Sequence, residues 1–205
     1  MFLSYLTLAC SASYKLKEKK SQFIGYSSPV ANISEAETFI SFIKNRHSDA
    51  THNCYAYVLF ENSVFRSSDD GEPSGTAGVP ILSVIQKENL TNCAVVVTRY
   101  FGGILLGAGG LVRAYSAAAK GTVTNSGIKT MNLYSVCMLL CSYDQYNKIN
   151  HFIVQHEGII KNVDYSAEVC VTFAVKSDKF SLFKNDLCNF TSNLITPHLI
   201  KEEFE

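Results

Sequence analysis

The spacing of hydrophobic residues changes along this chain, and each spacing predicts a different secondary structure. Between 34 and 47 the apolar residues recur at intervals of three and four, as on one face of an amphipathic helix. We expect Ser34 and Glu37 to form the capping box at its start, because a hydroxyl and a carboxylate three residues apart can each accept a backbone N–H. Residues 92–100 are largely apolar and β-branched, which indicates a strand buried on both faces.

Shorter patterns complete the first part of the chain. We expect a first strand or packed arm, further strands that include a hairpin around a turn at 61–63, and two further helices. Pro80 falls in the first turn of the earlier of these helices, where its missing N–H costs nothing. The predicted segments are a strand or arm at 2–10, strands at 21–26, 54–60 and 64–66, a loop at 67–78, and helices after that loop and at 111–123.

After residue 133 the pattern restarts and predicts a second domain. Strand, helix, hairpin, helix and strand follow one another, which is the βαββαβ order of the ferredoxin-like fold. We expect Asp144 and Asp178 to cap the two helices, and Gly158 to end the first of them in the left-handed conformation. The predicted segments are strands at 133–141, 159–165, 167–176 and 195–204, with helices at 144–156 and 178–190.

These elements predict an α+β protein with two domains. The boundary is expected within 125–132, so that residues 1–130 form the first domain and residues 131–205 the second. A covered sheet with helices is expected in the first domain, because its central strand is buried on both faces.

Composition restricts the functional classes. Of the 205 residues, 47% are hydrophobic, so the chain can bury a substantial core and is not generally disordered. The 18 basic residues equal the 18 acidic ones, which argues against a protein that coats nucleic acid by bulk electrostatic attraction. No apolar run approaches the roughly 18 residues of a membrane-spanning helix, so we expect a soluble protein with no membrane partner.

The charges are nevertheless unevenly distributed. Residues 1–130 contain eight Lys and four Arg against nine acidic residues, a net charge of +3. Residues 131–205 contain six Lys against nine acidic residues, a net charge of −3. Because arginine grips phosphate and carboxylate groups with two hydrogen bonds at once, and all four arginines lie in the first domain, we expect any anion contact there. Ordinary scatter of surface charge is the alternative.

Cysteine usage points to a reducing compartment. The seven cysteines are an odd number and form no C-x-x-C pair, which fits neither a zinc ribbon nor a disulfide scaffold. No basic residue precedes the apolar stretch at 2–10, as an export signal would require. We therefore expect a cytoplasmic protein.

The segment that links the buried strand to the next helix is the first candidate site. Its glycines expose backbone N–H groups beside the positive end of the helix dipole, which is the outline of an anion site. Arginines would add charge and an aromatic ring could stack on a base; the alternative is that the glycines only allow tight packing. The candidate anion- or RNA-binding residues are Arg99, Tyr100, Gly102, Gly103, Gly107, Gly109, Gly110 and Arg113.

The loop before the Pro80 helix is the second candidate. Its three carboxylates within four residues could hold a divalent cation, but calcium-loop spacing is lacking, so we expect a recognition loop, or a plain polar turn, and no metal. His52 and Cys54 could pair as base and nucleophile, although a histidine that shapes the loop is the simpler interpretation. The candidate loop residues are His52, Asn53, Asp69, Asp70, Gly71, Glu72, Pro73, Ser74, Gly75 and Thr76.

These motifs together resemble the IMPACT/YigZ family. The resemblance rests on residues 52–54, 69–76, 99–103 and 107–115 and extends over nearly the whole chain. The C-terminal part is similar to the small domain that accompanies this module in bacterial members, so a bacterial two-domain member of the YigZ type is implied. The resemblance implies a ribosomal-protein-S-five second-domain-like fold for the first domain. For the second it implies a ferredoxin-like fold of the elongation-factor C-terminal-domain type.

The resemblance also implies a connection with translation. Eukaryotic relatives restrain the amino-acid-starvation kinase that phosphorylates a translation initiation factor, but they carry a different N-terminal domain, so that partner is not carried over. We expect a non-enzymatic regulator of translation, without catalytic residues or cofactors, that binds RNA, the ribosome or a translation-associated protein. The alternative is a small-molecule or phosphate-ester-binding enzyme or sensor, with a pocket between the loop at 69–78 and the turn at 102–110.

Overall fold

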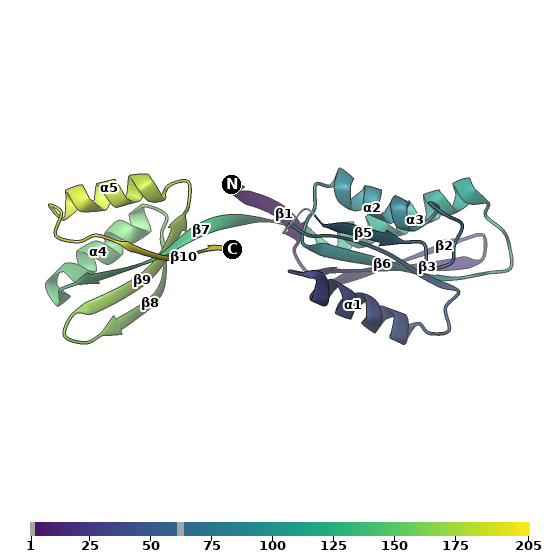
Figure 1. The fold of residues 1–205 in the computed structure, drawn as a ribbon, viewed down its shortest axis with the longest axis horizontal. Coiled ribbons are helices and arrows are strands. Elements are labelled where there is room, and N and C mark those ends of the chain that lie inside the picture. The colour runs from purple at the N-terminus through teal and green to yellow at the C-terminus, as the bar shows by residue number, and fades with distance from the viewer. Residues whose placement is uncertain (1–2, 61–63) are drawn as a thin grey trace. The chain divides into compact units, whose positions relative to one another are not determined.

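The computed structural model describes residues 3–60 and 64–205, and the chain divides into two compact units (Figure 1). The first unit contains Tyr5–Thr130, and the second contains Met131–Glu205 with residues 3–4. The turn expected at 61–63 lies outside the described residues. None of the helices in the described ranges has the length and apolarity that a membrane span requires.

The first unit is an antiparallel sheet with helices on both faces (Figure 1). Its strands, in spatial order, are β2 (Ala12–Glu18), β3 (Ser21–Pro29), β6 (Cys93–Tyr100), β4 (His52–Val58) and β5 (Phe65–Ser68). Its helices are α1 (Ile33–Arg46) on one face, and α2 (Gly78–Lys87) and α3 (Ala108–Ser126) on the other. The predicted hairpin is confirmed, because β4 pairs with β5.

The central strand β6 contributes to both cores of this unit. Val95 and Val97 lie in the core beneath α2 and α3, while Ala94 and Val96 lie in the core beneath α1. All four side chains are fully buried. Alternate residues of a strand point to opposite faces of the sheet, so two cores require an unbroken apolar run. The predicted strand buried on both faces is confirmed.

The second unit has the ferredoxin-like arrangement. Its strands, in spatial order, are β10 (His198–Phe204), β7 (Ile128–Cys141), β9 (Val169–Lys176) and β8 (Ile159–Tyr165), and β7 also pairs with β1 (Ser4–Leu8). Both helices, α4 (Tyr143–Gln155) and α5 (Phe180–Phe190), pack against the same face of the sheet. The last strand lies beside the first, and the third lies between the first and the second. The α+β class and the predicted βαββαβ order are therefore confirmed.

The start of α1 differs from the predicted one. Asn32 is the N-cap, and its Oδ1 accepts a hydrogen bond from the N–H of Glu35 at 2.9 Å. The Glu35 carboxylate accepts the N–H of Ala31 at 2.8 Å, so this pair satisfies two donors in the manner of a capping box. Ser34 lies inside the helix. The prediction that Ser34 and Glu37 form the box was wrong, because the equivalent pair, Asn32 and Glu35, lies two residues earlier.

The helix ends of the second unit are also shifted. Ser142 caps α4, so Asp144 lies in the first turn. The residue before α5 is Lys179, one position after the predicted cap Asp178. Glu157, with a φ of 59°, takes the left-handed conformation that we expected of Gly158. The helices themselves lie where their hydrophobic periodicity placed them.

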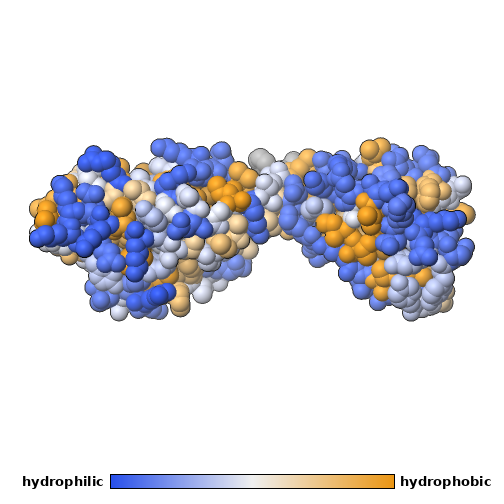
Figure 2. Space-filling model, turned by 180° about the vertical axis from the view of Figure 1, so that it is seen from behind, coloured by the Kyte–Doolittle hydropathy of each residue, from blue (hydrophilic) through white to orange (hydrophobic). Residues whose placement is uncertain are grey.

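Large apolar side chains are exposed on both units, and Figure 2 shows them as separate areas between stretches of hydrophilic surface. In the second unit Leu194 is 77% exposed. In the first unit Leu105, in the segment between β6 and α3, is 83% exposed. The glycine-rich segment singled out by the sequence therefore carries an apolar side chain into solvent.

Candidate functional site

Asp69 holds the loop between β5 and α2 in place. Its carboxylate accepts the N–H groups of Gly75, Ala77 and Gly78 at 2.9, 2.9 and 2.8 Å. The N-cap residue of α2, Ala77, offers no side-chain acceptor, so Asp69 supplies the missing cap from an earlier part of the loop. Burial acts to raise the pKa of Asp69, but the three donors outweigh it and hold the pKa below the ordinary 3.8.

Asp70 fastens the same loop to α1 and β4. One carboxylate oxygen lies 2.6 Å from Nζ of Lys44, and the other accepts the N–H of Asn53 at 2.7 Å. The carbonyl oxygen of Asp70 accepts a hydrogen bond from Nδ1 of His52 at 2.8 Å. Burial acts to raise the pKa of Asp70, yet Lys44 and the Asn53 N–H lower it overall. His52 and Asn53 thus anchor the loop.

Beneath this loop lies a set of polar side chains that we call the buried cluster: His52, Cys54, Glu72, Arg99 and Tyr115. Oε1 of Glu72 accepts hydrogen bonds from Nη1 of Arg99 at 2.6 Å and from the hydroxyl of Tyr115 at 2.7 Å. The side chains of Glu72 and Arg99 are only 3% and 6% exposed. The negative charge of Glu72 and the positive charge of Arg99 therefore neutralise each other inside the fold.

Two aromatic rings complete the surroundings of Arg99. Its Cζ lies 5.5 Å from the ring centre of Phe23 and 5.4 Å from that of Phe101, which is the geometry of a cation–π interaction. In the sheet, Arg99 stands between Phe23 on β3 and His52 on β4. Because its charge is engaged by Glu72 and by both rings, we remove Arg99 from the candidate surface for an external anion.

Cys54 lacks the properties of a nucleophile. Its Sγ lies 2.9 Å from the carbonyl oxygen of Asp69 and 3.4 Å from the hydroxyl of Tyr115. Burial raises the pKa of Cys54 to about 12 and also raises the pKa of Tyr115. The thiolate is the nucleophilic form of cysteine, so at neutral pH Cys54 is a protonated core residue.

Tyr100 belongs to a second polar group, on the face of the sheet that α1 covers. The two ring nitrogens of His47 lie 2.7 Å from the hydroxyl of Tyr26 and 2.8 Å from that of Tyr100, and Tyr100 donates to Asp49 at 3.0 Å. Burial, assisted by Arg46, lowers the pKa of His47 below 6.5. His47 and Tyr26 are not recognisable as a pair from the sequence, because only the fold brings these distant positions together.

The glycines after β6 serve different structural purposes. A Cβ on Gly102 would lie 2.1 Å from the carbonyl carbon of Lys20, so the turn between β2 and β3 packs directly on this backbone. Gly103 and Gly107 have φ values of 80° and 72°, a region that other residues enter only with strain. Gly102 thus allows the backbone of Lys20 to pack on the segment, and Gly103 and Gly107 allow the segment to turn.

Gly109 and Gly110 lie in the first turn of α3, which begins three residues before the predicted start. The N-cap, Gly107, has no side chain, and the first turn contains no acidic residue. The first N–H groups of a helix have no acceptor within the helix, so those of α3 are directed outward. A Cβ on Gly109 would lie 3.6 Å from Nη1 of Arg113, so this guanidinium lies beside the helix start.

Along the segment between β6 and α3 lies what we call the glycine surface: Lys19, Lys20, Phe101, Leu105 and Arg113, with the backbone of 102–110. Lys19 and Arg113 line one hollow of about 240 Å³, to which Glu18 also contributes. Phe101 is 44% exposed. None of the ion pairs formed within residues 3–60 and 64–205 includes Lys19, Lys20 or Arg113. The surface therefore combines uncommitted cations, backbone donors and an aromatic ring.

The loop does not assemble its acidic side chains into a pocket. Glu72 meets Arg99, whereas Asp69 caps α2 and Asp70 binds Lys44 and β4. The remaining loop residues form turns: Thr76 donates to the carbonyl of Pro73 at 2.7 Å, Gly71 and Gly75 have φ values of 89° and 76°, and Ser74 is exposed. Across the part of the chain that the structure describes, no group of three His, Cys, Asp or Glu side chains is placed to hold a metal ion.

Comparison with known proteins relates both units to described domains. The Impact N-terminal domain matches residues 19–123, and a domain of unknown function (DUF1949) matches residues 139–193. IMPACT family member YvyE of Bacillus subtilis is 38% identical over 198 residues, which cover 95% of this chain and 91% of that protein. IMPACT family member YigZ of Escherichia coli is 32% identical over 202 residues, which cover 97% and 99%.

Two further similarities define how far the relationship extends. A crystal structure of a hypothetical protein, 31% identical to this chain, superposes with a TM-score of 0.65 over 98% of this chain and 99% of that one. Protein IMPACT of Rattus norvegicus is 33% identical over 98 residues, which cover 45% of this chain and 30% of that protein. The bacterial similarities thus span both units, and the similarity to the rat protein spans less than half of the chain.

Proposed function

This chain belongs to the IMPACT family, and from that premise we propose that it is a non-enzymatic regulator of translation in the cytoplasm that binds RNA of the translation machinery. The link to translation comes from the family resemblance. The choice of RNA rests on the chemistry of the glycine surface. The fold alone would support neither the link to translation nor the choice of RNA, since one fold can serve many functions.

The single observation that carries the proposal is the start of α3. Its outward N–H groups lack a side-chain cap, and Arg113 lies beside them. Backbone N–H groups at a helix N-terminus, together with a guanidinium, match the geometry and charge of a phosphate group. Lys19 lines the same hollow as Arg113, and the backbone of Lys20 packs on Gly102, so both lysines extend the positive surface along the segment, as a chain of phosphates would require.

The exposed side chains of the same segment favour nucleic acid over a free phosphate ester. Phe101 presents almost half of its surface to solvent. Aromatic side chains next to cations stack on unpaired bases, and such stacking depends little on sequence. A phosphate-ester enzyme would instead need catalytic groups that face the hollow beside Arg113, whereas the carboxylates of the loop are bonded to Arg99, to the start of α2 and to Lys44.

The buried cluster supports a binding role rather than catalysis. Glu72 and Arg99 neutralise each other, and the raised pKa of Cys54 keeps its thiol protonated. Both groups stabilise the position of the loop and the end of β6. In this interpretation the cluster holds the glycine surface in shape and leaves the contact with RNA to exposed residues.

A salt titration of RNA binding tests the proposal. Fluorescence anisotropy with labelled single-stranded RNA should give an affinity that falls with salt, with a log–log slope of about −0.7 per phosphate contact. The combined change Lys20→Gln and Arg113→Gln should make the slope shallower by about 1.4, because two contacts are removed.

Lys87→Gln with Arg66→Gln provides the matched control. Both residues are exposed cations of the same unit, at the end of α2 and on the edge strand β5. The control pair should bind like the wild type. Equal slopes for the wild type and the Lys20 and Arg113 variant would refute the assignment of the glycine surface.

A further inference from the structure

A second exposed surface lies on the opposite face of the sheet, beside α1. The core beneath α1 is formed with β6 and β4 and includes no residue of β2, so α1 leaves the outer strands of this face uncovered. Leu16 packs into the other core, beneath α2 and α3. Because neighbouring strand residues point to opposite faces, Lys15 and Lys17 lie on the uncovered face.

Two hollows of about 430 Å³ each follow this face, and both are lined by Phe39 and Phe42. We call the second of them the α1 groove. Its lining combines hydroxyl groups, aromatic rings and one cation: Ser11, Ser13, Tyr26, Phe39, Phe42 and Arg46. The groove therefore offers hydrogen bonds, stacking and positive charge in one place.

The groove has the charge and exposure of a binding site for a polyanion. Phe42 is 61% exposed, and the guanidinium of the exposed Arg46 lies 5.7 Å from the ring centre of Tyr26. Among the residues that the structure describes, none that lines the groove carries a carboxylate. Glu35 lines the adjoining hollow and not the groove, and its carboxylate accepts the Ala31 N–H at the start of α1.

We propose that the α1 groove binds single-stranded RNA, with a base stacked on Phe42 and phosphates bound by Arg46 and Lys15. The inference rests on the proposed function, that the chain binds RNA, and adds the form of the RNA and a second contact surface. Serine hydroxyls in the groove match the 2′-hydroxyl of ribose, which both donates and accepts hydrogen bonds.

The groove selects single strands because of Phe42. A base can stack on an exposed ring only when it has left its own duplex stack, so a duplex offers Phe42 no partner. The groove is lined by hydroxyl groups, aromatic rings and a cation. A groove for a basic peptide would instead require acidic side chains. Single-stranded RNA fits both the exposed ring of Phe42 and the lining of the groove, because it offers unstacked bases and negatively charged phosphates.

Binding of a labelled single strand of about 12 nucleotides, and of a duplex of the same sequence, tests the inference by anisotropy. Phe42→Ala should weaken single-strand binding by about tenfold, which is within the range for loss of one stacked base. Arg46→Gln should make the salt slope shallower by about 0.7, and Arg46→Lys should restore it. Duplex binding should be weaker than single-strand binding and insensitive to Phe42→Ala.

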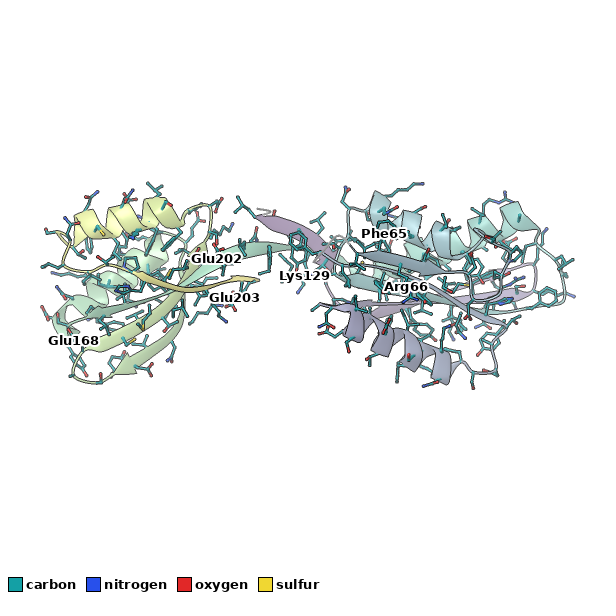
Figure 3. All side chains as sticks on the ribbon, viewed as in Figure 1. Phe65, Arg66, Lys129, Glu168, Glu202 and Glu203 are labelled. Carbon is teal, nitrogen blue, oxygen red and sulfur yellow. The ribbon has the colours of Figure 1, made fainter. Side chains whose placement is uncertain are left out.

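The edge strand β5 offers a closely matched control. Phe65 is 62% exposed and is followed by the exposed Arg66, and Figure 3 shows both on β5, which is the strand farthest from β2 in the sheet. Phe65→Ala and Arg66→Gln should bind both RNAs like the wild type. Circular dichroism of every variant checks that the fold is kept.

The outcomes separate the two proposals. If the wild-type chain binds neither RNA, both proposals fail. If the Lys20 and Arg113 variant loses affinity while Phe42→Ala and Arg46→Gln bind like the wild type, the glycine surface stands and the α1 groove is refuted. Equal affinity for the single strand and the duplex, or equal losses in the β5 controls, also overturns the groove assignment.

Discussion

Arg99 and Arg113 flank the same glycine segment but have opposite environments. Arg99 is buried between two rings and bonded to Glu72, whereas Arg113 is exposed beside the first turn of α3. A buried charge without its partner is strongly unfavourable, because the low-dielectric interior cannot replace the lost hydration. The first arginine therefore supports the fold, and the second is available to a ligand.

Glu72→Ala should destabilise the first unit by about 3–5 kcal/mol, because it leaves the Arg99 guanidinium buried and uncompensated. Urea unfolding followed by circular dichroism measures this loss. The double change Glu72→Met and Arg99→Met should cost less than the two single changes added together, since it removes both charges at once. Additive losses would show that the pair is not coupled.

The stability of the first unit should fall as the pH decreases through the ordinary pKa of histidine. The pKa of His47 is lowered below 6.5 in the fold, so the unfolded chain takes up the proton first. His47 therefore contributes stability that is present above 6.5 and is lost as the pH falls toward the lowered value. Arg46 and Lys15 oppose the charged form, and Asp49 favours it.

The variant His47→Gln should lose less stability than the wild type between about pH 7.5 and about pH 5.5. Thermal unfolding of both proteins at the two pH values measures the difference, and other histidines cancel in the comparison. The aspartates with lowered pKa titrate below 3.8 and so lie outside this window. Identical losses in the two proteins would contradict the role assigned to His47.

Residue types indicated the candidate segments, but they did not indicate which side chains are exposed. The glycine-rich segment and the acidic loop were both recognisable from the sequence. The pairing of Arg99 with Glu72 was not, because the two lie 27 positions apart and meet only after Asp69 and Asp70 have fixed the loop. His47 was missed because an isolated histidine at a helix end carries no pattern.

At the level of elements, the start of α1 shows how overlapping motifs compete. Asn32 and Glu35 have the same spacing as Ser34 and Glu37, so both pairs satisfy the capping-box pattern. The backbone decides between them: the N–H of Val30 is bonded to the carbonyl of Asn92, which fixes where the chain leaves the sheet. Hydrophobic periodicity locates a helix, but the cap depends on the path of the preceding strand.

Asn32→Ala should therefore destabilise the first unit by about 1 kcal/mol, because the N–H of Glu35 loses its acceptor. Ser34→Ala should change the stability by less than about 0.5 kcal/mol, as is usual for an exposed position without a special contact. Urea unfolding of the two variants gives the comparison directly. The reverse order of effects would restore Ser34 as the cap.

For the molecule as a whole, the zero net charge conceals opposite net charges on the two parts of the chain. The first part of the chain has a net charge of +3 and the second a net charge of −3. The glycine surface and the α1 groove both belong to the first unit, where every arginine lies. Long, strongly patterned segments allowed the two-domain α+β architecture to be predicted, whereas the surfaces depend on contacts between distant segments.

Ultraviolet crosslinking of the intact chain to single-stranded RNA, followed by mass spectrometry of the peptides, tests whether the glycine surface binds RNA. Crosslinks should include residues 100–113, with Phe101 as the principal site of this segment because its exposed ring can stack on a base. Lys20→Gln with Arg113→Gln should reduce their yield, and Lys87→Gln with Arg66→Gln should not. Crosslinks confined to residues 131–205 would show that the glycine surface does not bind RNA.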